Sequence, residues 1–97
     1  MSTNNWTVYL LRCSDNSLYC GISTDVDRRV ATHNAGRGAK YTKSRRPVEL
    51  VATSGEMTRG DALKLEYGIR KLPAHKKIKA LQEQATPPKA GKPQMQT

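Results

Sequence analysis

The sequence has few cysteines and no long apolar run, and both shortages exclude classes of protein. Its two cysteines, Cys13 and Cys20, do not form a CxxC pair, and together with His33 and His75 they match none of the usual zinc-ligand spacings. The longest apolar run, at positions 8–11, is too short to span a membrane, and the first residues lack the apolar segment of a secretory signal. We therefore expect a cytoplasmic protein with reduced thiols, without a zinc site and without a membrane partner.

Acidic residues are also scarce. Eight Asp and Glu are present against 17 Lys and Arg, so the formal net charge is +9. A domain with this excess of positive charge usually binds a polyanion, which predicts a nucleic-acid partner. DNA is the expected partner and RNA the alternative, while a basic protein that is merely soluble, or a ribosome-associated fragment, would have the same composition. At 97 residues the chain is long enough for one domain with a modest core.

The residues present predict an α+β fold, a small three-stranded sheet flanked by helices in the order β-β-α-β-α-α. Strands are expected at 6–13, 18–22 and 48–53, where β-branched, aromatic and apolar residues gather, and the turn residues at 14–17 join the first two into a hairpin. Helices are expected at 26–34, from the N-cap Thr58 to Pro73, and at 74–84. The first helix should cross one face of a mixed or antiparallel sheet.

The two ends of this pattern differ in composition. Residues 1–85 form the predicted domain, whereas 86–97 (TPPKAGKPQMQT) are rich in proline and polar residues and show no periodicity. Such a segment cannot bury enough apolar surface to order itself, so we predict a disordered polar tail.

Five residues in the predicted domain could carry chemistry. Tyr9 and Tyr19 lie on the adjacent strands of the hairpin, and Arg29 and His33 are four residues apart, on one face of a helix. Glu66 lies among apolar residues of the second helix, where a half-buried carboxylate needs a partner or a metal ion. Each has a simpler explanation: packing for the tyrosines, a solvent-facing position for Arg29 and His33, and an i, i+4 ion pair with Arg70 for Glu66.

A basic, glycine-containing loop follows the first helix at 36–47. Its cations can bind phosphates, although they could also simply face solvent. The candidate nucleic-acid-binding residues are Arg37, Lys40, Lys43, Arg45 and Arg46.

The order and spacing of these residues carry a resemblance to a known family. The pattern Tyr-x9-Tyr-x-Gly, then an Arg ten residues after the second Tyr, then a Glu on a later helix, resembles the GIY-YIG nuclease superfamily. Within it the chain is most similar to the small bacterial YhbQ-like (UPF0213) group, through YLLRCSDNSLYCGISTDVDRRVATHNAG, GAKYTKSRRPVELV and ALKLEYGIRKL. The resemblance covers about residues 6–81. Thr7-Val8-Tyr9 and Tyr19-Cys20-Gly21 stand for the two motifs, and the family's further Asn has no counterpart at 74–84.

This resemblance implies an endonuclease that hydrolyses phosphodiester bonds in DNA, selects structure rather than sequence, and acts in DNA repair or recombination. It implies that Glu66 holds one Mg²⁺ or Mn²⁺ and that Arg29 stabilises charge on the phosphoryl group. Tyr9 would be the general base, oriented by Tyr19, with His33 as the alternative proton relay. No small-molecule cofactor is expected. The alternatives are a nucleic-acid-binding module that has kept the fold without catalysis, and an adaptor that docks on a repair protein.

Overall fold

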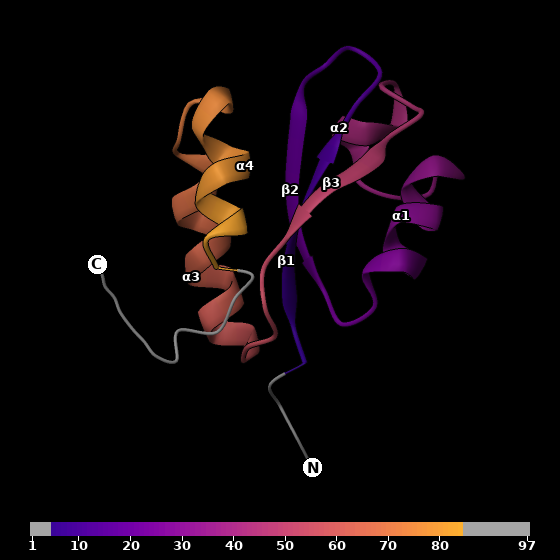
Figure 1. The fold of residues 1–97 in the computed structure, drawn as a ribbon. Coiled ribbons are helices and arrows are strands. Elements are labelled where there is room, and N and C mark those ends of the chain that lie inside the picture. The colour runs from indigo at the N-terminus through magenta and orange to yellow at the C-terminus, as the bar shows by residue number, and fades with distance from the viewer. Residues whose placement is uncertain (1–4, 85–97) are drawn as a thin grey trace.

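A three-stranded antiparallel sheet forms the middle layer of the protein (Figure 1). β1 (Thr7–Arg12) is the central strand and pairs with β2 (Leu18–Ser23) on one side and β3 (Glu49–Thr53) on the other. The computed structural model describes residues 5–84, so the tail predicted at 86–97 lies outside the described residues. Of the two sheet types expected, the antiparallel one is present, and the strands begin and end within one residue of their predicted bounds.

The hairpin between β1 and β2 forms because its turn satisfies itself locally. Asn16 has a φ of 69°, a left-handed conformation that asparagine tolerates better than most residues. Both the backbone N–H and the hydroxyl of Ser17 donate to Asp15 Oδ1, at 3.0 and 2.6 Å. The register that follows places Tyr9 opposite Gly21 and Leu11 opposite Tyr19.

Two helices cover one face of the sheet. α1 (Val26–Asn34) is capped by the side chain of Asp25, which accepts from the backbone N–H of Arg28, and the chain leaves the helix through Gly36 at a φ of 82°. Its Val26 and Val30, four residues apart, pack against the buried cluster of Tyr9, Leu11, Cys13 and Val48.

The second of these helices corrects the predicted order. α2 (Lys40–Lys43) lies inside the segment expected to be an irregular loop, so the order is β-β-α-α-β-α-α. A helix of four residues is little more than one turn, which is too short to show a hydrophobic period.

The opposite face is covered by α3 (Arg59–Arg70) and α4 (Ala74–Gln82). Thr58 caps α3 by accepting from the N–H of Asp61, and Pro73 separates the two helices, both as predicted. None of the helices in residues 5–84 is long and apolar enough to cross a membrane.

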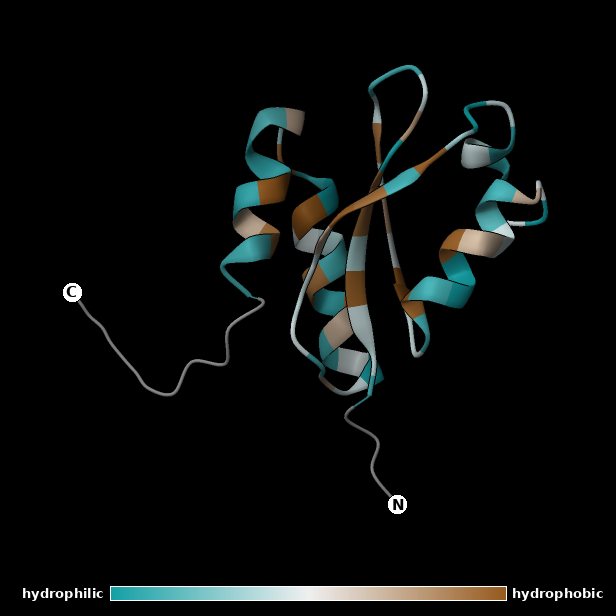
Figure 2. Cartoon of the chain, turned by 45° about the vertical axis from the view of Figure 1, so that its right-hand side comes forward, coloured by the Kyte–Doolittle hydropathy of each residue, from teal (hydrophilic) through white to brown (hydrophobic). Residues whose placement is uncertain are grey.

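Because helices cover both faces, β1 is buried on both sides and apolar throughout its middle, and Figure 2 shows the strands carrying much of the apolar colour. Tyr9 and Leu11 face the α1 layer, while Val8 and Leu10 face α3 and α4. The buried core on the α3 and α4 side consists of Val8, Leu10, Cys20, Ala52, Ala62, Ile69 and Leu81.

Candidate active site

The first candidate residue, Tyr9, is buried between β1 and α1 and begins a chain of polar contacts. Its hydroxyl lies 3.0 Å from Nε2 of His33, and Nδ1 of His33 lies 2.8 Å from Oγ1 of Thr42 in α2. His33 and Thr42 are fully buried and Tyr9 is 1% exposed. The solvent-facing explanation of His33 is therefore wrong, and Thr42 is a member of the site that the sequence did not indicate.

Gly21 makes room for Tyr9. It lies opposite Tyr9 in the hairpin, and a Cβ at this position would come within 2.5 Å of the Tyr9 hydroxyl oxygen. An interior glycine in a strand often marks such a close approach. The glycine of the second motif thus has a definite packing role, which is to let the tyrosine of the first motif lie across β2.

Burial and Arg29 together set the charges of this group. Burial raises the pKa of Tyr9 to about 12, although a hydrogen bond with Arg29 opposes that rise. Burial, with a smaller contribution from the Arg29 charge, lowers the pKa of His33. Burial also raises the pKa of Tyr19, which the Arg29 charge opposes. Arg29 therefore acts on all three side chains, and at neutral pH Tyr9 and His33 are both uncharged.

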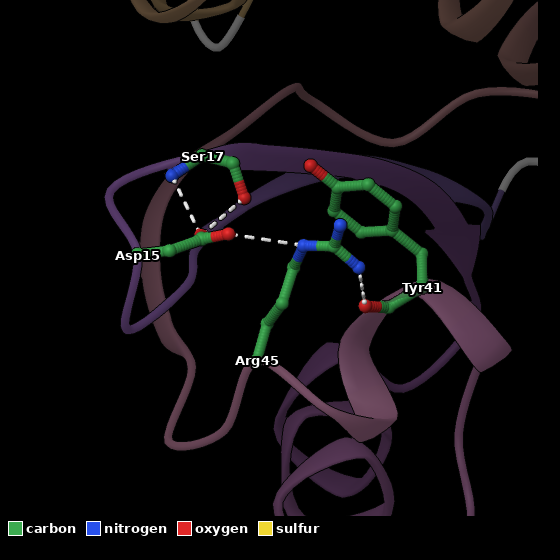
Figure 3. A network of polar contacts seen from close by, with 4 residues as sticks. All are labelled: Asp15, Ser17, Tyr41 and Arg45. Carbon is green, nitrogen blue, oxygen red and sulfur yellow. Dashed lines mark hydrogen bonds and ion pairs between the residues drawn. The ribbon is translucent and has the colours of Figure 1, made fainter.

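Tyr19 continues the site towards α2. Its ring meets the His33 ring edge to face, with centroids 5.2 Å apart, and stacks on the Tyr41 ring at 6.0 Å. The Arg45 guanidinium lies 4.0 Å from the centroid of Tyr41, and its Nη1 donates to the Tyr41 carbonyl at 2.8 Å. Figure 3 shows Arg45 also donating to Asp15 of the hairpin turn, at 3.0 Å. This network ties α2 to the hairpin, and Tyr41 is a further residue that sequence reasoning missed.

Glu66 reaches the site from the other face of the sheet. Its side chain is 17% exposed and lies 3.9 Å from the guanidinium of Arg70, so the predicted i, i+4 pair is present. Its charge contributes to the raised pKa values of Tyr19 and, after burial, of Cys20. Since both residues belong to the edge strand β2, the α1 and α3 sides of the site meet around that edge.

The donor set at Glu66 restricts the metal ion it could hold. Within residues 5–84 no three His, Cys, Asp or Glu side chains gather into a metal-binding group. One carboxylate is too few for a structural zinc site, but it suits Mg²⁺ or Mn²⁺, because Mg²⁺ keeps several water ligands and often takes only one or two carboxylates from the protein.

A cleft of about 240 Å³ opens between β2 and residues of α2, α3 and α4. Two cations line it: Arg70, and Lys77, whose Nζ donates to the carbonyls of Ile69 and Arg70 at 3.1 and 2.9 Å. The full lining is Leu18, Tyr19, Cys20, Tyr41, Arg70 and Lys77.

The cations of the basic loop divide into two groups. Arg37, Lys40 and Lys43 have exposed side chains. Arg45 is engaged by Asp15, and Arg46 donates to the carbonyls of Lys43 and Asn34, at 2.9 and 3.4 Å. The structure thus gives Arg45 and Arg46 contacts within the protein that the sequence did not indicate.

This arrangement corresponds to a known family. Residues 5–79 match the GIY-YIG catalytic domain, a span that includes all the candidate residues. The fold and the site therefore define a GIY-YIG domain, as the resemblance predicted.

Proteins with similar sequences indicate which group of the GIY-YIG family the chain belongs to. The chain is 49% identical over 76 residues to the UPF0213 protein SH2523 of Staphylococcus haemolyticus, a match that covers 78% of this chain and 93% of the relative. It is 47% identical over 83 residues to the UPF0213 protein YazA of Bacillus subtilis, covering 86% and 84%. The solution NMR structure of the protein EF2693 from E. faecalis is 40% identical, with a TM-score of 0.54 over 79% of this chain and 82% of that one. The chain belongs to the UPF0213 group of the GIY-YIG family.

Proposed function

We propose that the protein is a metal-dependent endonuclease that hydrolyses phosphodiester bonds in DNA. The observation that carries this proposal is the hydroxyl of Tyr9, which lies 3.0 Å from Nε2 of His33 and whose pKa the neighbouring Arg29 guanidinium lowers against the effect of burial. A phenol in contact with an imidazole and influenced by a guanidinium can exchange a proton beside a site for an anion. Ordinary strand packing does not need this combination.

Tyr9 and His33 act in this proposal as one proton-transfer unit. With a pKa of about 12, Tyr9 does not become a free phenolate at neutral pH. Its oxygen instead takes a proton from the attacking water while its own proton passes to Nε2 of His33. The water oxygen forms the new P–O bond, the P–O3′ bond breaks, and solvent supplies the proton for the leaving oxygen. His33 is suited to this role because burial and Arg29 keep it neutral before the reaction.

Arg29 and Glu66 deal with the phosphate charge. The exposed Arg29 guanidinium offers planar, charge-assisted hydrogen bonds to phosphoryl oxygens. Glu66 would hold one Mg²⁺ or Mn²⁺, which when bound supplies Lewis-acid stabilisation of the phosphoryl and leaving oxygens. Tyr19, packed edge to face against His33, orients the imidazole.

The rest of the substrate would lie along cations that contact phosphate rather than base edges. These are the exposed Arg37, Lys40 and Lys43 on one side of the β2 edge, and Arg70 and Lys77 in the cleft on the other. Phosphate contacts position a nucleic acid without carrying sequence information. We therefore propose selection by DNA structure rather than by sequence, and a role in DNA repair or recombination.

The test is cleavage of a panel of labelled DNA structures with Mg²⁺ or Mn²⁺, using the wild type, Glu66→Gln, and Glu56→Gln as the matched control. Glu56 is exposed in the turn before α3 and has no place in the site. The wild type and Glu56→Gln should cut, whereas Glu66→Gln should bind DNA without cutting. Equal cutting by all three would contradict the assignment of Glu66.

The same assay addresses the other function considered. The Glu66–Arg70 pair, at 3.9 Å, is the observation that favours a nucleic-acid-binding module, because a carboxylate neutralised by its own helix need not hold a metal ion. DNA binding without cleavage of any substrate by the wild type would support that module.

A further inference from the structure

The hydroxyl of Thr42 lies in the centre of a packed region with two polar partners. Its Oγ1 is 2.8 Å from Nδ1 of His33, and it donates to the carbonyl of Ala39 at 2.9 Å. Thr42 is fully buried in a helix of only four residues. Valine would fill the same volume, so packing alone does not explain a buried hydroxyl here.

The single proton of the Thr42 hydroxyl determines which group donates and which accepts in these hydrogen bonds. A threonine hydroxyl has one proton, and the carbonyl of Ala39 can only accept. Once Thr42 donates to Ala39, its oxygen can only accept from His33, so the proton of the neutral imidazole lies on Nδ1. Nε2 then carries a lone pair, and it accepts from the hydroxyl of Tyr9 at 3.0 Å.

One contact favours the opposite arrangement. The backbone N–H of Ala39 points at Nδ1 of His33 from 3.3 Å, and this bond requires an unprotonated Nδ1. It lies beyond the usual range of about 2.7–3.2 Å, whereas both bonds of the Thr42 hydroxyl lie within it. The two shorter bonds of the Thr42 hydroxyl therefore favour the proton on Nδ1. The Ala39 N–H would donate to Nδ1 only if that nitrogen lost its proton.

The backbone at Gly38 and Ala39, just before α2, passes close to the imidazole of His33. A Cβ at Gly38 would collide with Nδ1 of His33, so only glycine allows the chain to pass this close. The two residues that interact with Nδ1, Ala39 and Thr42, follow directly from this approach.

We propose that Thr42 is a positioning residue that holds His33 as the Nδ1–H tautomer, which leaves Nε2 free to take the proton of Tyr9. The inference rests on the proposed function for its chemical meaning, because only a proton acceptor at Nε2 lets Tyr9 act on water. Which nitrogen of a histidine is protonated is set by the hydrogen bond at the other nitrogen.

Replacing Thr42 should reverse the tautomer. Thr42→Val keeps the shape but removes the acceptor for Nδ1–H, and among residues 5–84 the Ala39 N–H then remains as the polar partner of Nδ1. Nδ1 should lose its proton to Nε2, and Nε2–H should donate to Tyr9. The other ionisable groups that face His33 are Tyr9, Tyr19 and Arg29, and this substitution alters none of them.

The first measurement is ¹⁵N NMR of the His33 ring in the full chain near neutral pH, which tells a protonated ring nitrogen from an unprotonated one. The wild type and Thr42→Ser should show a protonated Nδ1, and Thr42→Val a protonated Nε2. A wild type already protonated on Nε2, or a Thr42→Val protein still protonated on Nδ1, would overturn the proposal. This readout does not depend on cleavage, so it stands even if the protein proves to be no nuclease.

The second measurement is single-turnover DNA cleavage by the same proteins. Thr42→Val should be slower by between about 10² and 10⁴-fold, the range for losing general-base catalysis or its correct tautomer. Thr42→Ser should keep most of the rate. Ser54→Ala controls for the loss of a buried hydroxyl, because the Ser54 hydroxyl bonds the backbone of Val8 and of Gly55 rather than a side chain of the relay, and it should cut like the wild type. Equal slowing of Ser54→Ala and Thr42→Val would reduce Thr42 to a structural role.

Discussion

Tyr9 combines burial with an exchangeable proton, and the two properties oppose each other. Burial keeps the hydroxyl protonated, with a pKa of about 12, whereas a general base must accept a proton. The contact with His33 resolves the conflict, because the phenol can accept one proton while releasing another. The open choice between Tyr9 and His33 as the base thus becomes, in our proposal, a single relay through both.

Tyr9→Phe should separate this relay from the packing of the ring. The change removes one oxygen from a buried side chain and adds no volume, so the fold and DNA binding should stay near normal. Cleavage should slow by about 10²–10⁴-fold, as for loss of a general base. Tyr67→Phe is the control, since Tyr67 is 63% exposed on α3. Normal cleavage by Tyr9→Phe in a single-turnover assay would remove Tyr9 from the mechanism.

The depressed pKa of His33 predicts the dependence of cleavage on pH. The relay needs a neutral imidazole, and burial with Arg29 holds the pKa of His33 below the usual 6.5. In the proposed mechanism the cleavage rate should therefore stay above half of its neutral-pH value at pH 6.5, and the midpoint of its loss should lie at lower pH. A rate that is half lost by pH 6.5 would contradict the depressed pKa.

The same shift affects folding. Because the unfolded chain binds the proton of this histidine more readily than the folded one, the free energy of unfolding should fall as the pH drops through the unfolded pKa towards the folded one. Denaturant unfolding at a series of pH values measures this. His33→Gln, which cannot titrate, should show a weaker dependence on pH over the same range.

Individual residues differ in how far the sequence reveals them. Arg29 and His33 follow from a spacing of four in a helix, and the resemblance supplies their roles as predictions. Thr42 and Tyr41 have no such signal, because both lie in the short helix α2, which contacts α1 and β2 only through the tertiary fold. Such contacts depend on tertiary structure and leave no local pattern.

Among the elements, α2 shows the limit of local reasoning. The bounds of α1 follow from its cap at Asp25 and the left-handed Gly36, which are local features. α2 has no side-chain cap bond at its N-terminus and spans four residues. Contacts of the residues that follow it stabilise α2 instead. Arg45 bonds Asp15 of the hairpin, and Arg46 donates to the carbonyl of Lys43 at the end of α2.

Arg46 should therefore matter more for stability than its exposure suggests. Its guanidinium joins the end of α2 to the end of α1 through two carbonyls, where a cation also suits the helix dipoles. Arg46→Ala should lower the free energy of unfolding by about 1 kcal/mol, or about 4–8 °C in Tm for a domain of this size. Lys43→Ala, whose side chain is exposed, should leave Tm unchanged in the same thermal scan. Identical melting of the two variants would contradict the role given to Arg46.

For the molecule as a whole, the excess of cations predicts salt-sensitive binding. If about five phosphates are neutralised, log K should fall with log salt at a slope near −4 to −5 on duplex DNA. Removing Lys40 and Lys43 together should flatten the slope by about 0.9 for each phosphate that the variant no longer neutralises. Fluorescence anisotropy at several salt concentrations measures both. An affinity that does not change with salt, or one that depends strongly on the DNA sequence, would contradict a phosphate-dominated mode.

The layering of the molecule could be predicted only in part. Periodicity indicated a sheet with a helix over one face, and both remaining helices were expected. That β2 is an edge strand, and that Tyr19 and Glu66 approach it from opposite layers, depends on strand order. Neither hydrophobic period nor turn chemistry encodes strand order, so the convergence of these residues was available only through the family resemblance.

The position of the carboxylate along the chain has a consequence for synthesis. Tyr9, His33 and Thr42 all precede β3, whereas Glu66 lies on α3, after all three strands. A polypeptide leaves the ribosome from its N-terminus, and domains fold as units once enough of the chain is available. In the function proposed here, a nascent chain therefore lacks the proposed metal ligand until α3 has emerged, and we expect a product truncated before α3 to leave the nucleic acids around it uncut.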